Sequence, residues 1–134
     1  MQSRKSTIIL LVTFFIGLSV LLYPSISSYW NSKTQSEAIV DYEAMLAAYK
    51  PEDYSSFFEA ADQYNADLAA LPVHLRDYPQ LSDVYWNTLD VSGTGMMGYI
   101  TIPKIGQELP VYHGTSDGVL SVAVGHLEGT SLPV

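Results

Sequence analysis

The strongest constraint on this chain is an almost unbroken apolar run near its N-terminus, from Ile8 to Tyr23. With Thr7 and Pro24–Ile26 it approaches the ~20 residues that a helix needs to cross the ~30 Å core of a bilayer. A backbone in hydrocarbon must satisfy its own hydrogen bonds, so this segment is expected to be helical. The sequence therefore predicts a transmembrane anchor over residues 7–26.

The residues beside the anchor predict its orientation. Arg4 and Lys5 precede the apolar run, and Tyr29 and Trp30 follow it, where aromatic rings suit a membrane interface. Residues 1–6 are therefore expected in the cytoplasm, and the rest of the chain outside a single-pass cell-membrane protein. The lipid bilayer is thus one expected partner.

A cleaved signal peptide is the alternative to a retained anchor. The run is short for a membrane span, and Ser25-Ile26-Ser27 loosely resembles a small-x-small cleavage site. In both cases the remainder of the chain is exported.

The exported part is acidic and has no cysteine. All 14 Asp and Glu residues follow the apolar run and only four basic residues oppose them, which gives this part a formal charge of −10. A nucleic-acid partner is excluded because it would require a basic surface. The absence of Cys excludes disulfides, thiolate metal sites and a cysteine nucleophile among these 134 residues.

Two helices are predicted within residues 27–70. One apolar stripe at helical spacing contains Ile39, Tyr42, Leu46 and Tyr49, widened by Met45. A second stripe contains Tyr54, Phe57, Phe58, Ala61, Tyr64, Asn65 and Leu68. The helices are expected to separate at Lys50-Pro51, since proline suits the first turn of a helix. The tyrosine-rich stripes are expected to pack against a larger body.

The next segment, residues 71–92, shows no regular spacing and is predicted to be an ordered loop. Its punctuating residues are Pro72, Asp77, Pro79, Ser82, Asp83 and Asn87. Aromatic and apolar residues between them argue against a disordered linker.

Strand-like residues begin after Gly93. The expected elements are strands at Tyr99–Ile102 and Leu109–Tyr112 with a Gly106-Gln107 turn between them, a short helix around Val119-Leu120, and an apolar run at Val122–Val124. Pro110 is expected at an edge, an end or a bulge, because proline cannot donate to a strand ladder. So few strands cannot close a barrel, so the strand part alone is expected to fold poorly.

No complete active site is recognisable from the residues alone. The histidines His74, His113 and His126 lack metal-ligand spacing, and no glycine-rich phosphate loop is present. His113 and His126 are expected to be hydrogen-bonded structural histidines, with a general-base role as the alternative. Neither a metal nor a cofactor is predicted.

Three motifs in order resemble one known family. Met97–Ile105 resembles a "G-x-I-x-I-P-x-I" first strand, Leu109–Thr115 an "L-P-V-Y-x-G-T" second strand, and Val124–Pro133 a "G-x-G-H-x-x-G-T-S-L-P" segment. These are motifs of the class C, pilin-polymerising sortases. The preceding layout of anchor, helices and loop is similar to the same class.

The resemblance implies a fold and an activity. It implies a transmembrane helix, a helical hairpin and a loop, followed at residues 93–134 by the first strands of an incomplete closed β-barrel, in an α+β protein that is mainly β when whole. It also implies a cysteine transpeptidase that cleaves LPxTG-like sorting signals and joins pilin subunits, its partners, through lysine isopeptide bonds. The catalytic His, Cys and Arg are expected beyond Val134, so the 134-residue chain is predicted to be inactive.

Class C sortases also have a lid, a loop that places an Asp-Pro-aromatic motif in the active site. The matching region here reads Arg76-Asp77-Tyr78-Pro79, with Trp86 further on, and departs from that motif. Asp77, Tyr78 and Trp86 are the lid candidates, and the alternative is that Tyr78 and Trp86 only pack the loop onto the barrel. For the whole chain, the alternative function is a non-catalytic, membrane-tethered extracellular interaction module.

Overall fold

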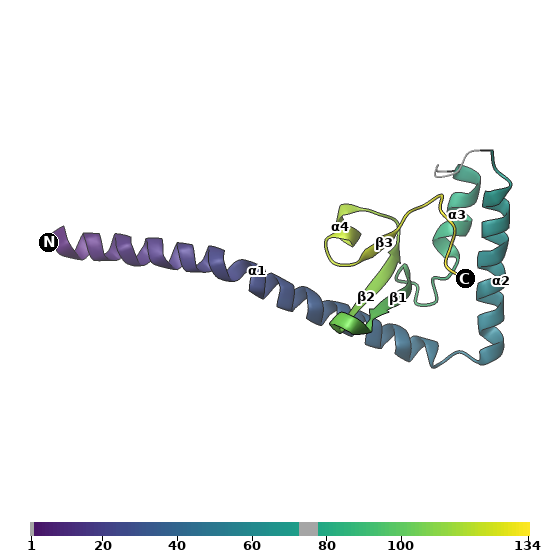
Figure 1. Cartoon of the computed structure of the whole chain (residues 1–134), viewed down its shortest axis with the longest axis horizontal. Coiled ribbons are helices and arrows are strands. Elements are labelled where there is room, and N and C mark those ends of the chain that lie inside the picture. Colours follow the sequence, from purple (N-terminus) through teal and green to yellow (C-terminus); the bar gives the residue numbers. More distant parts are fainter. Residues whose placement is uncertain (1, 73–77) are drawn as a thin grey trace. The chain divides into compact units, whose positions relative to one another are not determined.

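The computed structural model describes residues 2–72 and 78–134. In chain order the elements are α1 (Gln2–Leu46), α2 (Pro51–Ala69), α3 (Pro79–Asn87), β1 (Met96–Ile102), the 3-10 helix η1 (Pro103–Ile105), β2 (Gln107–His113), α4 (Asp117–Leu120) and β3 (Val124–His126) (Figure 1). Two compact units make up the chain, one ending at Thr34 and the other spanning Gln35–Val134.

The first unit is the N-terminal part of α1. The large apolar side chains of its predicted anchor are exposed, and the helix runs through Pro24 without a break. Within Arg4–Leu46, α1 is long and apolar enough to cross a membrane, with a mean hydropathy of 2.3 over its most apolar window. Thr13 and Ser19 each donate a hydroxyl hydrogen bond to the carbonyl four residues earlier, which satisfies these polar groups inside the helix. This segment therefore has the properties of an anchor or a signal sequence.

The C-terminal part of α1 belongs to the second unit. Ile39 and Tyr42 are buried against Met96 of β1, as the predicted stripe requires. Met45 and Tyr49, which the stripe also included, are 40% and 37% exposed. The helix ends at Leu46, whose carbonyl accepts a hydrogen bond from the Tyr54 hydroxyl at 2.6 Å. The predicted separation of two helices at Lys50-Pro51 is confirmed, because α2 begins at Pro51.

Helix α2 contributes one wall of the main core. Ala61, Tyr64 and Leu68 are at most 4% exposed and pack with Leu89, Met97 and other buried residues. Phe58 is half exposed, so the predicted stripe was one residue too wide. Asn65 lies beside this stripe and makes two hydrogen bonds with the Leu132 backbone, at 2.7 Å and 3.0 Å. The segment after β3 is thereby held against α2.

The prediction of a loop over residues 71–92 was wrong at Pro79–Asn87, where α3 forms. Pro79 occupies the first turn of α3, where proline's missing N–H costs nothing. Leu81 and Tyr85, four residues apart, turn one face toward the core, and Figure 1 shows α3 alongside α2. The polar residues read as turn signals lie on the other positions of this short helix.

The sheet has three strands in the order β1-β2-β3. β1 and β2 are antiparallel, whereas β2 and β3 are parallel and pair only at Val111–His113. Pro110 therefore precedes the stretch with partners on both sides, which explains how a proline fits in the central strand. Both predicted strands and the short helix near Val119-Leu120 are present, and the apolar run at Val122–Val124 leads into β3.

A bulge in β1 lets this strand contribute a side chain to each of the two hydrophobic clusters. The register of β1 with β2 shifts between Met96 and Gly98. Two consecutive residues, Met96 and Met97, are consequently both buried, although strand side chains normally alternate. Met96 packs with Ile39 and Tyr42 of α1, while Met97 packs with the α2–α3 core. The bulge thus lets one short strand join both clusters.

Candidate functional site

The side chain of Tyr85 connects α3 to the sheet and is fully buried. Its hydroxyl donates to the His126 carbonyl at 2.6 Å and accepts from the Gly114 N–H at 3.0 Å. The His126 Nδ1 atom lies 3.2 Å from the same oxygen. A single hydroxyl therefore bonds groups at the ends of β2 and β3.

Three further rings surround Tyr85. Its ring centroid lies 5.0 Å from that of His113, 5.3 Å from that of Trp86 and 5.7 Å from that of His126. Trp86 and His113 also contact each other, at 5.8 Å with an angle of 37° between their planes. We call Tyr85, Trp86, His113 and His126 the Tyr85 cluster.

Two glycines allow the Tyr85 cluster to close. A Cβ atom on Gly114 would lie 2.6 Å from the Trp86 indole, and Gly114 has a positive φ of 76°. A Cβ atom on Gly125 would lie 2.4 Å from the Gly114 carbonyl oxygen. Both approaches are shorter than side-chain carbons tolerate, so these two positions require glycine.

The Tyr85 cluster is suited to holding neighbouring backbone groups in position. Burial raises the pKa of Tyr85 to about 12, although its hydrogen bond from Gly114 acts in the opposite direction. The phenol is therefore neutral near pH 7 and serves as a hydrogen-bond donor and acceptor. Sequence reasoning did not single out Tyr85, because its polar partners lie 29 and 41 residues away.

The two described histidines have hydrogen-bond partners, as the sequence predicted. His113 is 3% exposed, and its ring nitrogens contact the carbonyl oxygens of Gly95 and Thr88. His126 Nε2 lies 3.0 Å from the Ser131 carbonyl oxygen. His74 lies outside the described residues. Within 2–72 and 78–134 no group of three or more His, Asp and Glu side chains is placed to hold a metal ion.

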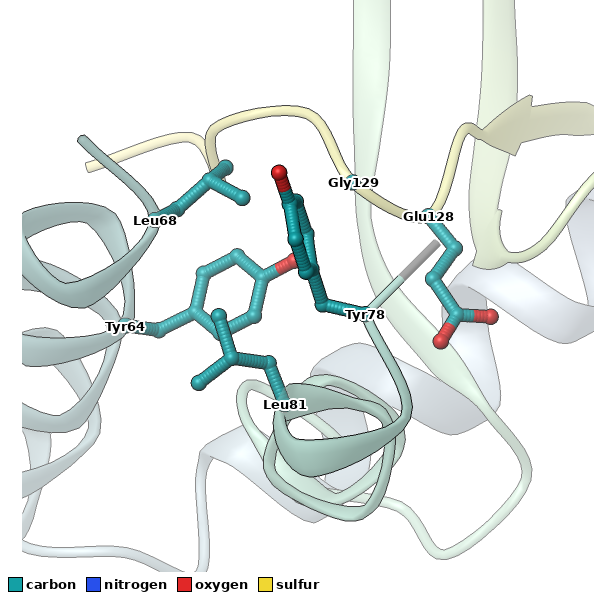
Figure 2. Close-up of a pocket in the computed structure, with 6 residues that line it drawn as sticks. All are labelled: Tyr64, Leu68, Tyr78, Leu81, Glu128 and Gly129. Atoms are coloured by element: carbon teal, nitrogen blue, oxygen red, sulfur yellow. The ribbon is translucent and has the colours of Figure 1, made fainter. Parts of the chain in front are cut away.

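The lid candidates occupy different surroundings. Tyr78 is half-buried and lines a shallow depression with Tyr64, Leu68, Leu81, Glu128 and Gly129. Figure 2 shows the Tyr78 ring beside that of Tyr64, with the Glu128 carboxylate directed away from them. No space for a water molecule remains there. Tyr78 thus fills the junction between α2, α3 and the turn after β3.

Trp86, the second described lid candidate, packs on the sheet instead. Its ring lies against Gly114 and His113, while 45% of the side chain remains exposed. Asp77, the third candidate, lies outside the described residues. The contacts of Tyr78 and Trp86 are those expected from simple packing, and the lid role stays a prediction.

One face of the sheet and the neighbouring helices bear apolar hollows. A cavity of about 330 Å³ is lined by Met97, Gly98, Tyr99, Ile100, Val111, Val124, Gly125, His126 and Pro133. A second cavity, of about 380 Å³, is lined by Tyr42, Leu46, Tyr54, Phe57, Phe58, Leu89, Val91, Met97 and Pro133. Both are open and predominantly apolar, so they expose surface that would normally pack in a core.

Comparison with solved structures gave consistent matches. Sortase C1 from Streptococcus agalactiae is 40% identical with a TM-score of 0.65, covering 72% of this chain and 50% of that one. Sortase C from Clostridium perfringens is 34% identical with a TM-score of 0.55, covering 73% of this chain and 51% of that one. The same C. perfringens enzyme, solved in an intermolecular complex with the C-terminal cell wall sorting signal motif, is 33% identical with a TM-score of 0.54, covering 73% and 46%.

Other comparisons add nothing to these matches: no protein-family model and no curated protein matched the chain. The chain spans about half the length of the solved structures it matches. Its helices and small three-stranded sheet correspond to part of the sortase fold, without barrel closure. The ordered sequence motifs, the fold and the identities of 33–40% to these enzymes together show that the chain belongs to the class C sortases.

Proposed function

We propose that this chain is the membrane-anchored N-terminal part of a class C sortase that cleaves LPxTG-like sorting signals and joins pilin subunits through lysine isopeptide bonds. The observation that carries the proposal is the 40% identity to S. agalactiae sortase C1 over 72% of the chain. Support for a sorting signal as substrate comes from the complex formed by the C. perfringens relative. The exposed apolar helix supports attachment to a membrane.

The proposed chemistry requires groups that this chain does not contain. A thiolate would attack the Thr–Gly bond of the sorting signal and release the glycine amine, forming a thioacyl enzyme. The amine of a pilin lysine would then displace the thiolate and form the isopeptide bond. The 134 residues contain no cysteine, so on this proposal the nucleophile would lie in sequence beyond them. On this proposal, the described residues anchor the enzyme and form part of its folded scaffold, and the catalytic groups lie elsewhere.

The test begins with the coding DNA after codon 134. We expect the frame to continue into a Gly-Gly turn with a histidine soon after it, followed by a Thr-x-x-Cys strand and an arginine. The longer protein should then cleave a fluorogenic LPxTG peptide, and replacing its cysteine by alanine should abolish cleavage. A stop codon after Val134 would exclude catalysis by this protein and favour the membrane-tethered interaction module.

We also propose that Asp77 and Tyr78 form a variant lid over the cysteine of the full-length enzyme. Tyr78 directly precedes α3 and is seated between α2 and the Glu128-Gly129 turn, which would fix one end of such a lid. Asp77→Ala in the full-length enzyme should raise peptide hydrolysis and speed labelling of the cysteine. Asp62→Ala is the control, because it removes an exposed carboxylate on α2, outside the lid candidates. Unchanged hydrolysis and unchanged labelling in the Asp77 variant would contradict the lid.

A further inference from the structure

The segment between β2 and β3 is bonded to α1. We call residues 117–123, which comprise α4 and the three residues after it, the α4 turn; Figure 1 shows α4 beside β3. Gln35, the first residue of the second unit, donates a side-chain amide hydrogen bond to the Val122 carbonyl oxygen at 2.5 Å. The α4 turn is therefore fastened to the point at which α1 enters the second unit.

Two large apolar side chains of the α4 turn are left uncovered by the protein. Leu120 is 54% exposed and Val122 is 40% exposed. Single exposed apolar side chains are common on protein surfaces and do not by themselves indicate a partner. What distinguishes this pair is its place along the chain, because the hydrogen bond from Gln35 holds it near the end of the predicted anchor.

The covalent chain limits how far the α4 turn can lie from the membrane. Tyr29 and Trp30, whose rings suit a membrane interface, precede Gln35 by six and five residues. Whatever the angle between the two units, five residues of chain span at most about 18 Å. The headgroup region extends about 5–8 Å beyond the hydrocarbon core on each side of a bilayer. The bond from Gln35 to Val122 therefore keeps the α4 turn within reach of the headgroups.

The backbone of the α4 turn is already satisfied inside the protein. The N–H groups of Leu120–Ala123 donate to the carbonyl oxygens of residues 116, 117 and 119. The Ser121 hydroxyl donates to the Gly118 carbonyl oxygen at 2.8 Å, and the Val122 carbonyl oxygen accepts from Gln35. Because these polar groups have partners, the turn can enter a less polar medium without leaving them unpaired.

We propose that the α4 turn contacts the bilayer that holds the anchor, with Leu120 and Val122 in the headgroup region and Gln35 holding the turn in place. This inference rests on the membrane attachment proposed above. The contact is apolar in character, because the exported part is acidic and Asp117 begins α4, so negative headgroups would not attract it. A bilayer of zwitterionic lipid is therefore a sufficient partner.

Phe58 of α2 offers a matched comparison. Its side chain is 51% exposed, which is close to the value for Leu120. It lines a cavity together with Leu46, the last residue of α1. Eleven residues of helix separate Gln35 from Leu46, a distance of about 16 Å. The two exposed side chains thus belong to opposite ends of the part of α1 that lies in the second unit.

The test places spin labels on single cysteines of the whole chain, which has no native cysteine. Leu120→Cys, Phe58→Cys and, in the anchor, Phe15→Cys would each carry a nitroxide in phosphatidylcholine nanodiscs. Electron paramagnetic resonance then measures collisions of each label with oxygen, which concentrates in lipid, and with a nickel chelate, which stays in water. We expect the label at position 120 to lose most of the nickel collisions seen at position 58 and to keep its oxygen collisions.

The remaining outcomes separate this contact from the anchor. A label at position 120 that meets the nickel chelate as often as the label at position 58 would overturn the contact. Shielding of position 120 from both agents would indicate cover by protein, a second copy included, and would overturn lipid as the occupant. Nickel collisions at position 15 would overturn the membrane attachment itself. Val122→Cys repeats the measurement if the Leu120 variant does not fold.

A second variant tests the role of Gln35. Gln35→Ala removes the amide that bonds the Val122 carbonyl oxygen, so the label at position 120 should regain collisions with the nickel chelate. Thr34→Ala is the control, since the Thr34 hydroxyl bonds only the Trp30 carbonyl oxygen of the same helix among the printed sequence neighbours, at 3.1 Å. Unchanged shielding in the Gln35 variant would contradict the role assigned to this hydrogen bond.

Discussion

At the scale of single residues, the Tyr85 hydroxyl links the ends of two strands. It completes hydrogen bonds for the backbone N–H of Gly114, directly after β2, and for the carbonyl of His126, the last residue of β3. In the sequence, Tyr85 is one aromatic residue in an aromatic stretch. Local spacing in the sequence cannot show which tyrosine hydroxyl will bond to groups far along the chain. It does indicate that a histidine at the end of a strand is a candidate for a structural role.

Replacing Tyr85 by phenylalanine should destabilise the second unit by about 2 kcal/mol, because two buried backbone groups lose their partner while the ring volume is kept. Urea unfolding followed by tyrosine and tryptophan fluorescence measures the change. Tyr99→Phe is the control, since the Tyr99 hydroxyl bonds Glu43 at the surface. Equal midpoints for the Tyr85 variant and the wild type would show that the hydroxyl is not a structural link.

The ionisation of Tyr85 should make stability fall at high pH. Its folded pKa of about 12 lies above the ordinary tyrosine value of 10.0, chiefly because of burial. The folded state therefore retains the proton, and the resulting stability is complete below pH 10 and lost as pH rises through about 12. We expect the stability difference between wild type and Tyr85→Phe to narrow over this interval. A constant difference, or tyrosinate absorbance showing all tyrosines ionising together, would contradict the raised pKa.

At the scale of elements, sequence reasoning succeeded where the pattern was long and regular. The apolar stripes of α1 and α2, the two strands and the short helix α4 were all anticipated within a few residues. Helix α3 was missed because its nine residues contain turn-forming types, and its helical state depends on packing Tyr85 and Leu81 into the core. The β1 bulge was also invisible, since it becomes evident only from the pairing partner.

The close approach of β3 to the end of β2 gives an element-scale prediction. Gly125→Ala would place a methyl carbon 2.4 Å from the Gly114 carbonyl oxygen and 3.1 Å from Leu120, so β3 must move away. We expect a loss of about 1–3 kcal/mol and faster amide exchange in β3 than in the β1–β2 pair. Gly98→Ala is the control, with nothing within 4 Å of the added carbon. Unchanged exchange at Val124–His126 would refute this account of the glycine.

At the scale of the whole molecule, the sequence predicted an apolar N-terminal helix long enough to cross a membrane, which the structure has, and the export of the remaining chain stays a prediction. It also predicted that so few strands cannot close a barrel, and in the described residues open apolar cavities lie beside Ile100 and Phe58. The candidate site could be predicted only in outline. His113 and His126 were recognised as structural, but the sequence pattern did not reveal their partners. Those of His113 lie at Thr88 and Gly95, and those of His126 lie on α3 and in the segment after β3.

Membrane topology can be tested without interference from native thiols, because the chain has no cysteine. In intact bacterial cells, Ala48→Cys should react with an impermeant maleimide, whereas Ser6→Cys should react only after lysis. Both positions are exposed in the structure. Labelling of Ser6→Cys from outside would reverse the proposed orientation. A labelled Ala48→Cys protein clearly smaller than the 14.8 kDa chain would instead demonstrate cleavage of the N-terminal segment.

The paired hydrogen bonds between Asn65 and the Leu132 backbone impose an order of events during synthesis. They join residues 67 positions apart, so α2 is made well before the partner that fixes its inner face. At translation rates of about 5–20 residues per second, this interval lasts about 3–13 s. Throughout that time Tyr64 and Leu68 lack the C-terminal residues, among them Leu132, that pack in the same cluster. A nascent domain of this kind is therefore most vulnerable to proteases and most dependent on chaperones while it is still emerging.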